Sequence, residues 1–265
     1  MDLFSIEFYA HSLGGAARVH VLLPSPEPQA LQDRGAQAVY AGLRAQRWPA
    51  LLLLHGMQGS ESAWLRHSMV EQHAAQAGVA VIMPSLLNSY GCDLGFGLSF
   101  EEYLRCELPA FLESRLPLDL SPQQYTVAGL SMGGFTALRL AALEPRRYAA
   151  AGSFSGALDP AAVVRRMGRH AAGAALAPAD ALAPLAGGGA QIPLYLACGA
   201  QDEIALEMNR QFHARLCRQA VAHTYEEWDG GHEWAFWDRA LHRFLAWRAG
   251  IVKGGAPCAP QKEGA

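Results

Sequence analysis

The chain has 265 residues, of which 51% are hydrophobic and 17% charged, so it can bury a sizeable core. Its formal net charge of −3 gives no basic surface of the kind that binds nucleic acid or an anionic membrane. No apolar stretch approaches the roughly 18 residues that cross a bilayer. Because MDLFSIEFYAHSLGG at the start also lacks the features of a secretory signal, we expect a soluble cytoplasmic protein.

The first quarter of the chain contains three predicted strands. FSIEFYA and ARVHVLLP alternate apolar and polar residues around a Gly-Gly pair, which predicts an antiparallel hairpin. Residues 25–49 are rich in proline and polar residues and are predicted to form a connection with at most a short helix. ALLLLHG is a continuous apolar run that ends at glycine, typical of a strand covered on both faces.

The middle of the chain alternates helices and buried strands. A helical stretch ends at Gly78 and leads into the strand VAVIMPS. Ser99 and Glu102 predict a capping box for the helix FEEYLRCELPAFLESRL, which Pro109 should bend. The strand QYTVAGL then runs directly into the helix MGGFTALRLAAL, and the strand-like YAAAGSFSG follows.

The last third begins with Asp159, which with the next proline is predicted to start a short helix. The alanine- and glycine-rich segment at about 168–190 is predicted to be a variable insertion, either mobile or loosely helical. IPLYLACG and AHTYEEW are the last strands, and Trp237 lies on the apolar face of the final helix, which makes it a core residue. Residues 252–265 are predicted to be a disordered tail. The alternation predicts a single α/β domain over residues 1–251, with a mostly parallel sheet.

Ser131 is the first candidate catalytic residue. It lies in AGLSMGG, a G-x-S-x-G pattern between a predicted strand and a predicted helix. A serine at this position stands on a sharp turn, and its flanking glycines avoid a Cβ clash with the neighbouring backbone. The alternative is a serine that merely caps the helix. Because a serine hydroxyl is a poor nucleophile, it needs a base that a third group orients.

The chain order Ser, acid, His indicates the other two residues. His232 follows a strand end and two glycines in DGGHEWAFWD, and Phe236 stands where a zinc motif H-E-x-x-H would have its second histidine. Asp202 lies in the loop after a buried strand and is preferred as the acid, whereas Asp159 is already explained as a helix cap. We expect no metal and no organic cofactor, because the triad chemistry requires neither. The five cysteines include no C-x-x-C pair and suggest neither a disulfide framework nor a zinc knuckle.

Acyl transfer also needs backbone N–H donors for the oxyanion. One is predicted at Met132, the residue after the serine, and the other at Met57 in the loop after the strand ALLLLHG. His55 in that loop is predicted to hold it by a hydrogen bond. Tyr90, and also Trp64 and Trp234, are predicted to reach the mouth of the substrate pocket.

Five motifs in order resemble the esterase D-like α/β-hydrolases, especially the bacterial tributyrin esterases: LLHGMQGSESAW, GLSMGGFTALRLA, RRYAAAGSFSGALD, CGAQDE and GGHEWAFWD. The resemblance covers about residues 2–248 and implies an α/β-hydrolase fold with helices on both faces of the sheet and an N-terminal antiparallel hairpin. It implies a serine carboxylesterase for short acyl chains, with Ser131, Asp202 and His232 as the triad. The S-G-L-T-C stretch of the glutathione thioesterases is replaced here by HGMQG.

The sequence leaves three functions open. The first is hydrolysis of small, short-acyl esters through an acyl-serine intermediate. The second uses the same triad as an acyltransferase or as a thioesterase of the S-formylglutathione hydrolase type. The third is a non-catalytic binding module. The expected partner is a small-molecule ester, and the sequence leaves open whether the protein forms a homo-oligomer.

Overall fold

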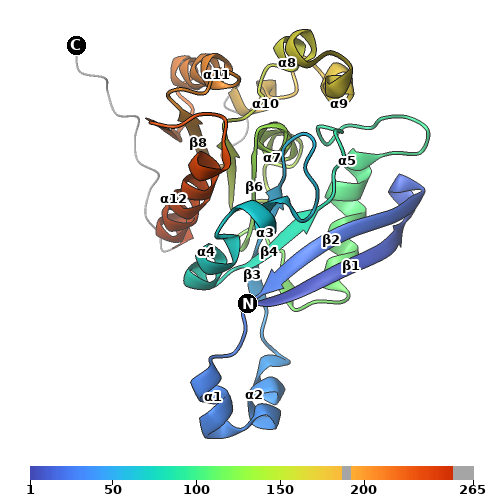
Figure 1. Cartoon of the computed structure of the whole chain (residues 1–265), viewed down its shortest axis with the longest axis vertical. Coiled ribbons are helices and arrows are strands. Elements are labelled where there is room, and N and C mark those ends of the chain that lie inside the picture. Colours follow the sequence, from blue (N-terminus) through green and yellow to red (C-terminus); the bar gives the residue numbers. More distant parts are fainter. Residues whose placement is uncertain (187–191, 253–265) are drawn as a thin grey trace.

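A nine-stranded sheet forms the centre of the computed structural model, which describes residues 1–186 and 192–252 (Figure 1). The strand order is β1-β2-β4-β3-β6-β7-β8-β9, and the short β5 pairs with β3. The strands are β1 (Asp2–Ala10), β2 (Gly15–Leu23), β3 (Trp48–Leu54), β4 (Ala80–Pro84), β5 (Leu118–Asp119), β6 (Tyr125–Leu130), β7 (Ala150–Phe154), β8 (Leu194–Gly199) and β9 (His223–Trp228).

The α-helices connect these strands. They are α1 (Pro28–Arg34), α2 (Ala36–Leu43), α3 (Ala63–His67), α4 (Val70–Ala77), α5 (Phe100–Glu102), α6 (Leu108–Glu113), α7 (Met132–Leu143), α8 (Pro160–Met167), α9 (Ala172–Leu176), α10 (Ala183–Ala186), α11 (Leu206–Arg218) and α12 (Trp234–Val252). Apart from Val252, the predicted C-terminal tail lies outside the described residues and stays a prediction.

The predicted hairpin and parallel sheet are confirmed. β1 and β2 pair antiparallel from Asp2 opposite Leu23 to Ala10 opposite Gly15. β2 also pairs antiparallel with β4, whereas β4, β3, β6, β7, β8 and β9 pair parallel with their neighbours. The carboxyl ends of the parallel strands therefore meet at one edge of the sheet, where ligands bind in open α/β sheets.

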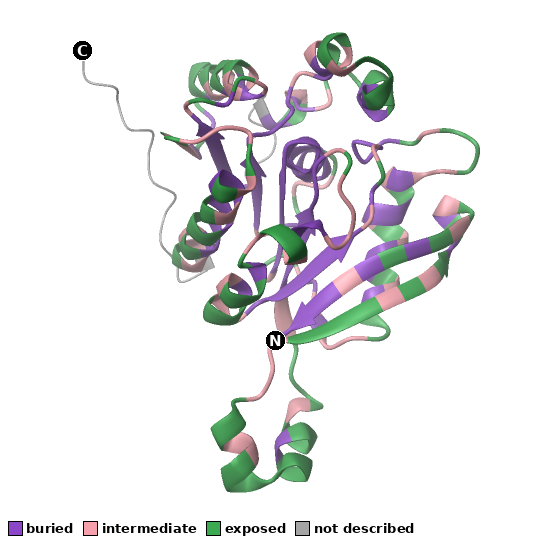
Figure 2. Ribbon diagram, in the orientation of Figure 1, coloured by how far each residue is buried: buried purple, intermediate pink, exposed green. Residues whose placement is uncertain are grey.

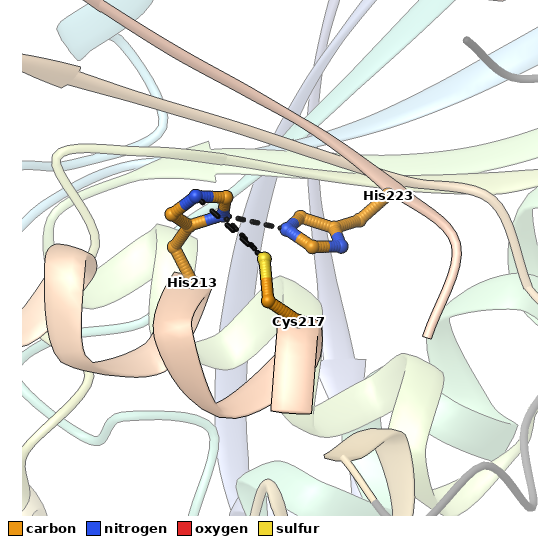
Figure 3. Close-up of side chains that lie close together, drawn as sticks. All are labelled: His213, Cys217 and His223. Atoms are coloured by element: carbon orange, nitrogen blue, oxygen red, sulfur yellow. Dashed lines mark hydrogen bonds between the residues drawn. The ribbon is translucent and has the colours of Figure 1, made fainter. Parts of the chain in front are cut away.

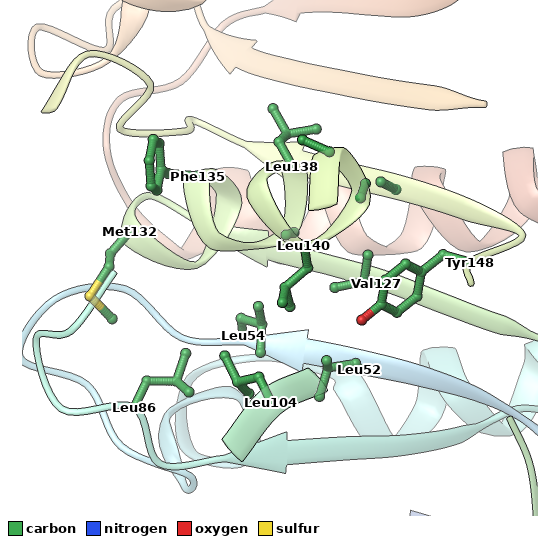
Figure 4. Close-up of a cluster of buried hydrophobic side chains, with 14 of the residues drawn as sticks. Leu52, Leu54, Leu86, Leu104, Val127, Met132, Phe135, Leu138, Leu140 and Tyr148 are labelled. Carbon is green, nitrogen blue, oxygen red and sulfur yellow. The ribbon is translucent and has the colours of Figure 1, made fainter. Parts of the chain in front are cut away.

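Side chains on the two faces of the sheet enter two separate cores. Leu52 and Leu54 of β3 join the core beneath α7, part of which Figure 4 shows, whereas Leu51 and Leu53 join the core beneath α4 and α12. This alternation follows from the two-residue period of a strand. Both faces are covered by helices, as expected for strands that are continuous apolar runs.

The 25–49 connection contains two helices, more than the one short helix that its sequence predicts. Pro28 stands in the first turn of α1, where its missing N–H costs no hydrogen bond, and Gly35, with φ 78°, separates α1 from α2. The pair projects from the body of the molecule and is largely exposed (Figures 1 and 2). Val39 is the buried residue of α2, and α1 buries none.

The helix from Phe100 differs from its prediction at the N-terminus and contains an irregular turn before Pro109. Ser99 stands at the N-cap, but its side chain makes no capping hydrogen bond, so the predicted capping box is wrong. The helix passes through a π-helical turn at Tyr103–Glu107 immediately before α6. Pro109 lies in the first turn of α6, so the irregular turn directly precedes the residue that cannot donate a backbone hydrogen bond.

In the described part of the alanine-rich segment, the structure bears out the helical alternative. This part, residues 168–186, forms a 3₁₀ turn followed by α9 and α10, and Ala171, Ala174 and Leu185 are buried in the core. A Cβ at Gly173 would clash with the backbone of Asn88. Small side chains therefore allow close packing here, which composition alone did not reveal; residues 187–190 lie outside the described residues.

Candidate active site

Ser131 occupies the sharp turn between β6 and α7. Its backbone has φ 50° and ψ −115°, an unfavourable conformation for a residue with a Cβ. A Cβ at Gly129 would lie 2.5 Å from the carbonyl carbon of Gly133, and one at Gly133 would clash with the carbonyl oxygen of Leu54. The two glycines therefore let strand, turn and helix pack closely enough to hold the strained serine.

Three side chains from separate loops form one hydrogen-bonded chain. The Nε2 atom of His232 lies 3.0 Å from Oγ of Ser131, and its Nδ1 lies 2.8 Å from Oδ2 of Asp202. Ser131 follows β6, Asp202 follows β8, and His232 follows β9, so the sheet brings all three to the same edge. The structure thus joins the three residues that the sequence analysis selected.

Asp202 is fully buried and held by more than the histidine. Its Oδ1 accepts hydrogen bonds from the backbone N–H groups of Ile204 at 3.0 Å and Ala205 at 2.8 Å. Burial by itself raises the pKa of this carboxyl, but the hydrogen bond and charge of His232, with further hydrogen bonds such as that from Ala205, outweigh it. The net pKa lies below the usual value, so Asp202 is a carboxylate at neutral pH.

Asp159 caps a helix, the role that the sequence predicted for it. It stands at the N-cap of α8, and its side chain accepts a hydrogen bond of 2.9 Å from the backbone N–H of Ala162. The His232 ring is bound to Asp202 instead. The geometry therefore favours Asp202 as the acid.

The loop after β3 is fixed by His55, as its sequence setting indicated. His55 is buried, and its Nε2 accepts a hydrogen bond of 2.9 Å from the backbone N–H of Leu86. The other ring nitrogen therefore carries the hydrogen and donates to the carbonyl of Gly56 at 2.7 Å. The side chain of Asn88 accepts from the backbone N–H of Gln58 at 2.8 Å. Met57 lies between these anchored residues.

Of the two predicted oxyanion donors, Met132 is next to Ser131 in the chain and Met57 is near it in space. Met57 lines the same cavity as Ser131 and His232. Met132 is the first residue of α7, so its N–H is one of those that an α-helix leaves without an intrahelical acceptor. The dipole of a helix favours negative charge at this end.

A cavity of about 820 Å³ opens over Ser131 and His232. Tyr90 and Trp234 line this cavity, and Tyr90 and Trp237 also belong to the buried cores. Trp64 corrects the prediction: it is 1% exposed, its indole N–H donates to the carbonyl of Leu54, and it lies behind Trp234 at a ring distance of 5.4 Å. Packing against the core keeps it out of the cavity wall.

The cavity wall also includes residues of α8 and α11 that the sequence did not predict. Val163 and Met167 of α8 and Met208 of α11 contribute apolar surface, and Arg166 and Glu207 add charge. An apolar helix face that lines a cavity has the same sequence pattern as one that packs in a core. No signal in the chain distinguishes the two cases.

Comparison with known proteins places the chain in a family. Residues 11–247 match the family model described as putative esterase. The chain belongs to this esterase family. It is 26% identical to an acetyl esterase from Caldicellulosiruptor saccharolyticus over 95% of this chain and 99% of that protein.

Two further proteins are similar to this chain, one in sequence over half of its length and one in fold over nearly all of it. The esterase is 31% identical to a diacylglycerol acyltransferase/mycolyltransferase Ag85A from Mycobacterium leprae over 52% of this chain and 44% of that protein. The crystal structure of S-formylglutathione hydrolase FrmB from Staphylococcus aureus matches with a TM-score of 0.78 and 24% identity, covering 93% of this chain and 98% of that one. The fold is that of the α/β-hydrolases.

The family and the Ser–His–Asp geometry identify the enzyme as a serine hydrolase of carboxylic esters. Among the helices that the structure describes, none combines the length and apolar character that a membrane span requires.

Proposed function

We propose that this esterase hydrolyses small esters with short acyl chains, with Ser131 as nucleophile, His232 as general base and acid, and Asp202 as the group that orients the imidazole. The observation that supports this most directly is the pair of contacts of His232, 3.0 Å to the serine oxygen and 2.8 Å to the carboxylate. Both distances lie within the hydrogen-bond reach that such catalysis needs.

Acylation begins when the serine oxygen attacks the ester carbonyl. Nε2 of His232 takes the proton from Oγ of Ser131 as the new C–O bond forms. The carbonyl oxygen becomes an oxyanion, which accepts hydrogen bonds from the backbone N–H groups of Met57 and Met132. The imidazolium then gives its proton to the leaving alcohol oxygen, and the acyl-serine remains.

Deacylation repeats these steps with water. His232 removes a proton from the attacking water, a second oxyanion occupies the same two backbone donors, and the proton returns to Oγ of Ser131 as the acid leaves. Asp202 stays ionised throughout and stabilises the imidazolium, since its pKa is already low. The steps use these groups and water alone.

Cavity size and lining support a small substrate. A volume of about 820 Å³ lies in the range of small-molecule sites, and its wall includes apolar side chains such as Val163, Met167 and Trp234. The similarity to an acetyl esterase over nearly the whole chain supports a short acyl group. The described cysteines are free thiols, which is consistent with the cytoplasmic location that we propose.

Replacing Ser131 with alanine tests the function. S131A should lower kcat for p-nitrophenyl acetate and butyrate by about 10⁴-fold or more, since it removes the nucleophile. It should also abolish covalent labelling by a fluorophosphonate probe. S114A, which changes an exposed serine at the end of α6, is the matched control and should retain full activity. Retention of most activity in S131A would refute the proposal.

Acyl transfer to an alcohol is the second candidate. The similarity to an acyltransferase over half of this chain favours it, because the same acyl-serine serves both reactions. Hydrolysis predicts free acid as the main product even with added alcohols or sugars, whereas a transferase would form the new ester at the expense of acid. The same assay with thioesters tests thioesterase activity.

A further inference from the structure

Three side chains with metal-binding atoms meet at the opposite end of β9 from His232. His213 and Cys217 lie one turn apart on α11, and His223 is the first residue of β9 (Figure 3). One ligand atom from each lies within 4.8 Å of the other two. Figure 3 shows the three side chains pointing toward one another across the space between helix and strand.

His223 presents a lone pair to this cluster. It is 2% exposed, and its Nδ1 lies 2.7 Å from the carbonyl oxygen of Val221. A carbonyl only accepts hydrogen bonds, so Nδ1 carries the hydrogen and the neutral ring keeps an unprotonated Nε2. A histidine that binds a metal is oriented in this way, with its second nitrogen donating to a carbonyl or carboxylate.

His213 faces the lone pair on Nε2 of His223, and its ring packs against Tyr225. Its Nδ1 lies 2.7 Å from Nε2 of His223, and its ring stacks on Tyr225 with centroids 4.3 Å apart. Sγ of Cys217 lies 3.8 Å from both ring nitrogens of His213, and this thiol is free and exposed. The cluster is therefore reachable from solvent, while its histidines are held in place.

We propose that His213, Cys217 and His223 bind a zinc ion that fastens α11 to β9. Two imidazole nitrogens and one thiolate form a ligand set that suits Zn²⁺, with a water molecule as the fourth ligand. With Zn–N distances of about 2.0–2.1 Å, tetrahedral ligand nitrogens lie about 3.3 Å apart. The two imidazoles need only separate slightly from their present hydrogen bond.

Two protons move when Zn²⁺ binds. The Nδ1 proton of His213, which now lies between the two rings, moves to its own Nε2, so the ring stays neutral and Nδ1 becomes a ligand. Cys217 loses its thiol proton to solvent and binds as thiolate. Binding of Zn²⁺ thus releases one proton from the protein and requires no oxidant or reductant.

Metal binding to the full-length protein tests the site. After removal of metals with a chelator, Co²⁺ should bind one per chain and give the thiolate-to-cobalt charge-transfer absorption that only a cysteine ligand produces. Zn²⁺ should displace the Co²⁺ and raise Tm, because a ligand that binds the folded state stabilises it. The variant S131A should behave like the wild type, which separates this site from the catalytic one.

Variants decide which residues bind the metal. C217S should abolish the charge-transfer band. Because C217S and H213A each remove a ligand atom, both should weaken Zn²⁺ binding by more than the about 10- to 100-fold that loss of an outer-shell partner costs. C106S, which changes another exposed and free cysteine, is the matched control and should bind as the wild type does. The proposal is wrong if folded wild-type protein gives no band and no rise in Tm, or if C217S binds both ions unchanged.

Discussion

Single residues carry the strain and the charge of the catalytic centre. Ser131 has a positive φ that an L-residue rarely adopts, and Asp202 is an ionised carboxylate with no exposed surface. Each is tolerated because its neighbours compensate: glycines flank the serine, and hydrogen-bond donors surround the carboxylate. Such features persist only where the surrounding structure holds them in place.

Replacing Asp202 with asparagine should separate its electrostatic role from its packing. The amide has nearly the same shape, but its NH₂ group cannot accept from Nδ1 of His232, so the imidazole is left in the wrong tautomer. We expect kcat for p-nitrophenyl butyrate to fall by about 10³- to 10⁴-fold, with a smaller change in KM. If D202N keeps at least a tenth of the wild-type kcat, Asp202 is not the orienting acid.

The low pKa of Asp202 also predicts a dependence of stability on pH. Because the pKa is lower in the folded state than in the unfolded state, ionisation of Asp202 stabilises the fold above the usual aspartate range, near pH 4. This contribution is lost as the pH falls through the folded-state pKa. The difference in unfolding free energy between wild type and D202N, measured with urea from pH 7 to about pH 3, should therefore shrink toward acid. A constant difference would contradict this account.

Among the elements, the junction of β6 and α7 depends on residues that lack a side chain. The helix follows the strand with only Ser131 between them, and its first turn lies against the carbonyl oxygens of Leu54 and His55 at the end of β3. A helix can approach a strand end this closely only where side chains are absent. The glycines in the sequence are therefore what makes this close contact possible.

Gly133 and Gly42 are a matched pair for testing this junction. G133A places a methyl group against the backbone of β3, which cannot yield, so we expect a loss of about 1–3 kcal/mol in unfolding free energy and reduced kcat. G42A changes an exposed glycine of α2 with nothing closer than 4.0 Å and should be neutral or stabilising by up to about 1 kcal/mol. Urea unfolding of both variants gives the comparison, and equal effects would argue against the contact.

At the scale of the whole molecule, the two ends of the parallel strands carry different features. The triad and its cavity lie at the carboxyl ends of the parallel strands, whereas α1 and α2 project from the other edge (Figure 1). The proposed zinc site lies where β9 begins, so α11 and β9 would join a metal site at one end to a catalytic loop at the other. Helices far from the triad can thus vary without disturbing it.

Deleting the α1–α2 pair tests this separation. Leu22 of β2 and Leu51 of β3 both pair with Val81, so the two strands lie about 10 Å apart, a distance that a short linker spans. Replacing residues 27–45 with four Gly and Ser residues should leave kcat/KM for p-nitrophenyl butyrate within about two-fold. A Tm within a few degrees is expected, since the pair buries little beyond Val39. A large loss of activity would indicate a role for the pair in the site.

The amino-acid sequence determined much of this protein by itself. The periodicities of strands and helices and the glycine pattern around Ser131 are local features. Together with the chain order of Asp202 and His232, these features predicted the fold and the three residues that the structure brings together. These steric and hydrophobic patterns depend only on residues that are close together in the chain, so the sequence alone reveals them.

Only the tertiary structure decided what depends on contacts between distant segments. Trp64 has the sequence setting of a pocket residue but lies in the core, and Gly173 in the alanine-rich segment packs closely against the backbone of Asn88. The cluster of His213, Cys217 and His223 follows no sequence motif, because its ligands meet only when α11 packs beside β9. Burial and side-chain convergence are properties of the folded chain, and no local pattern specifies them.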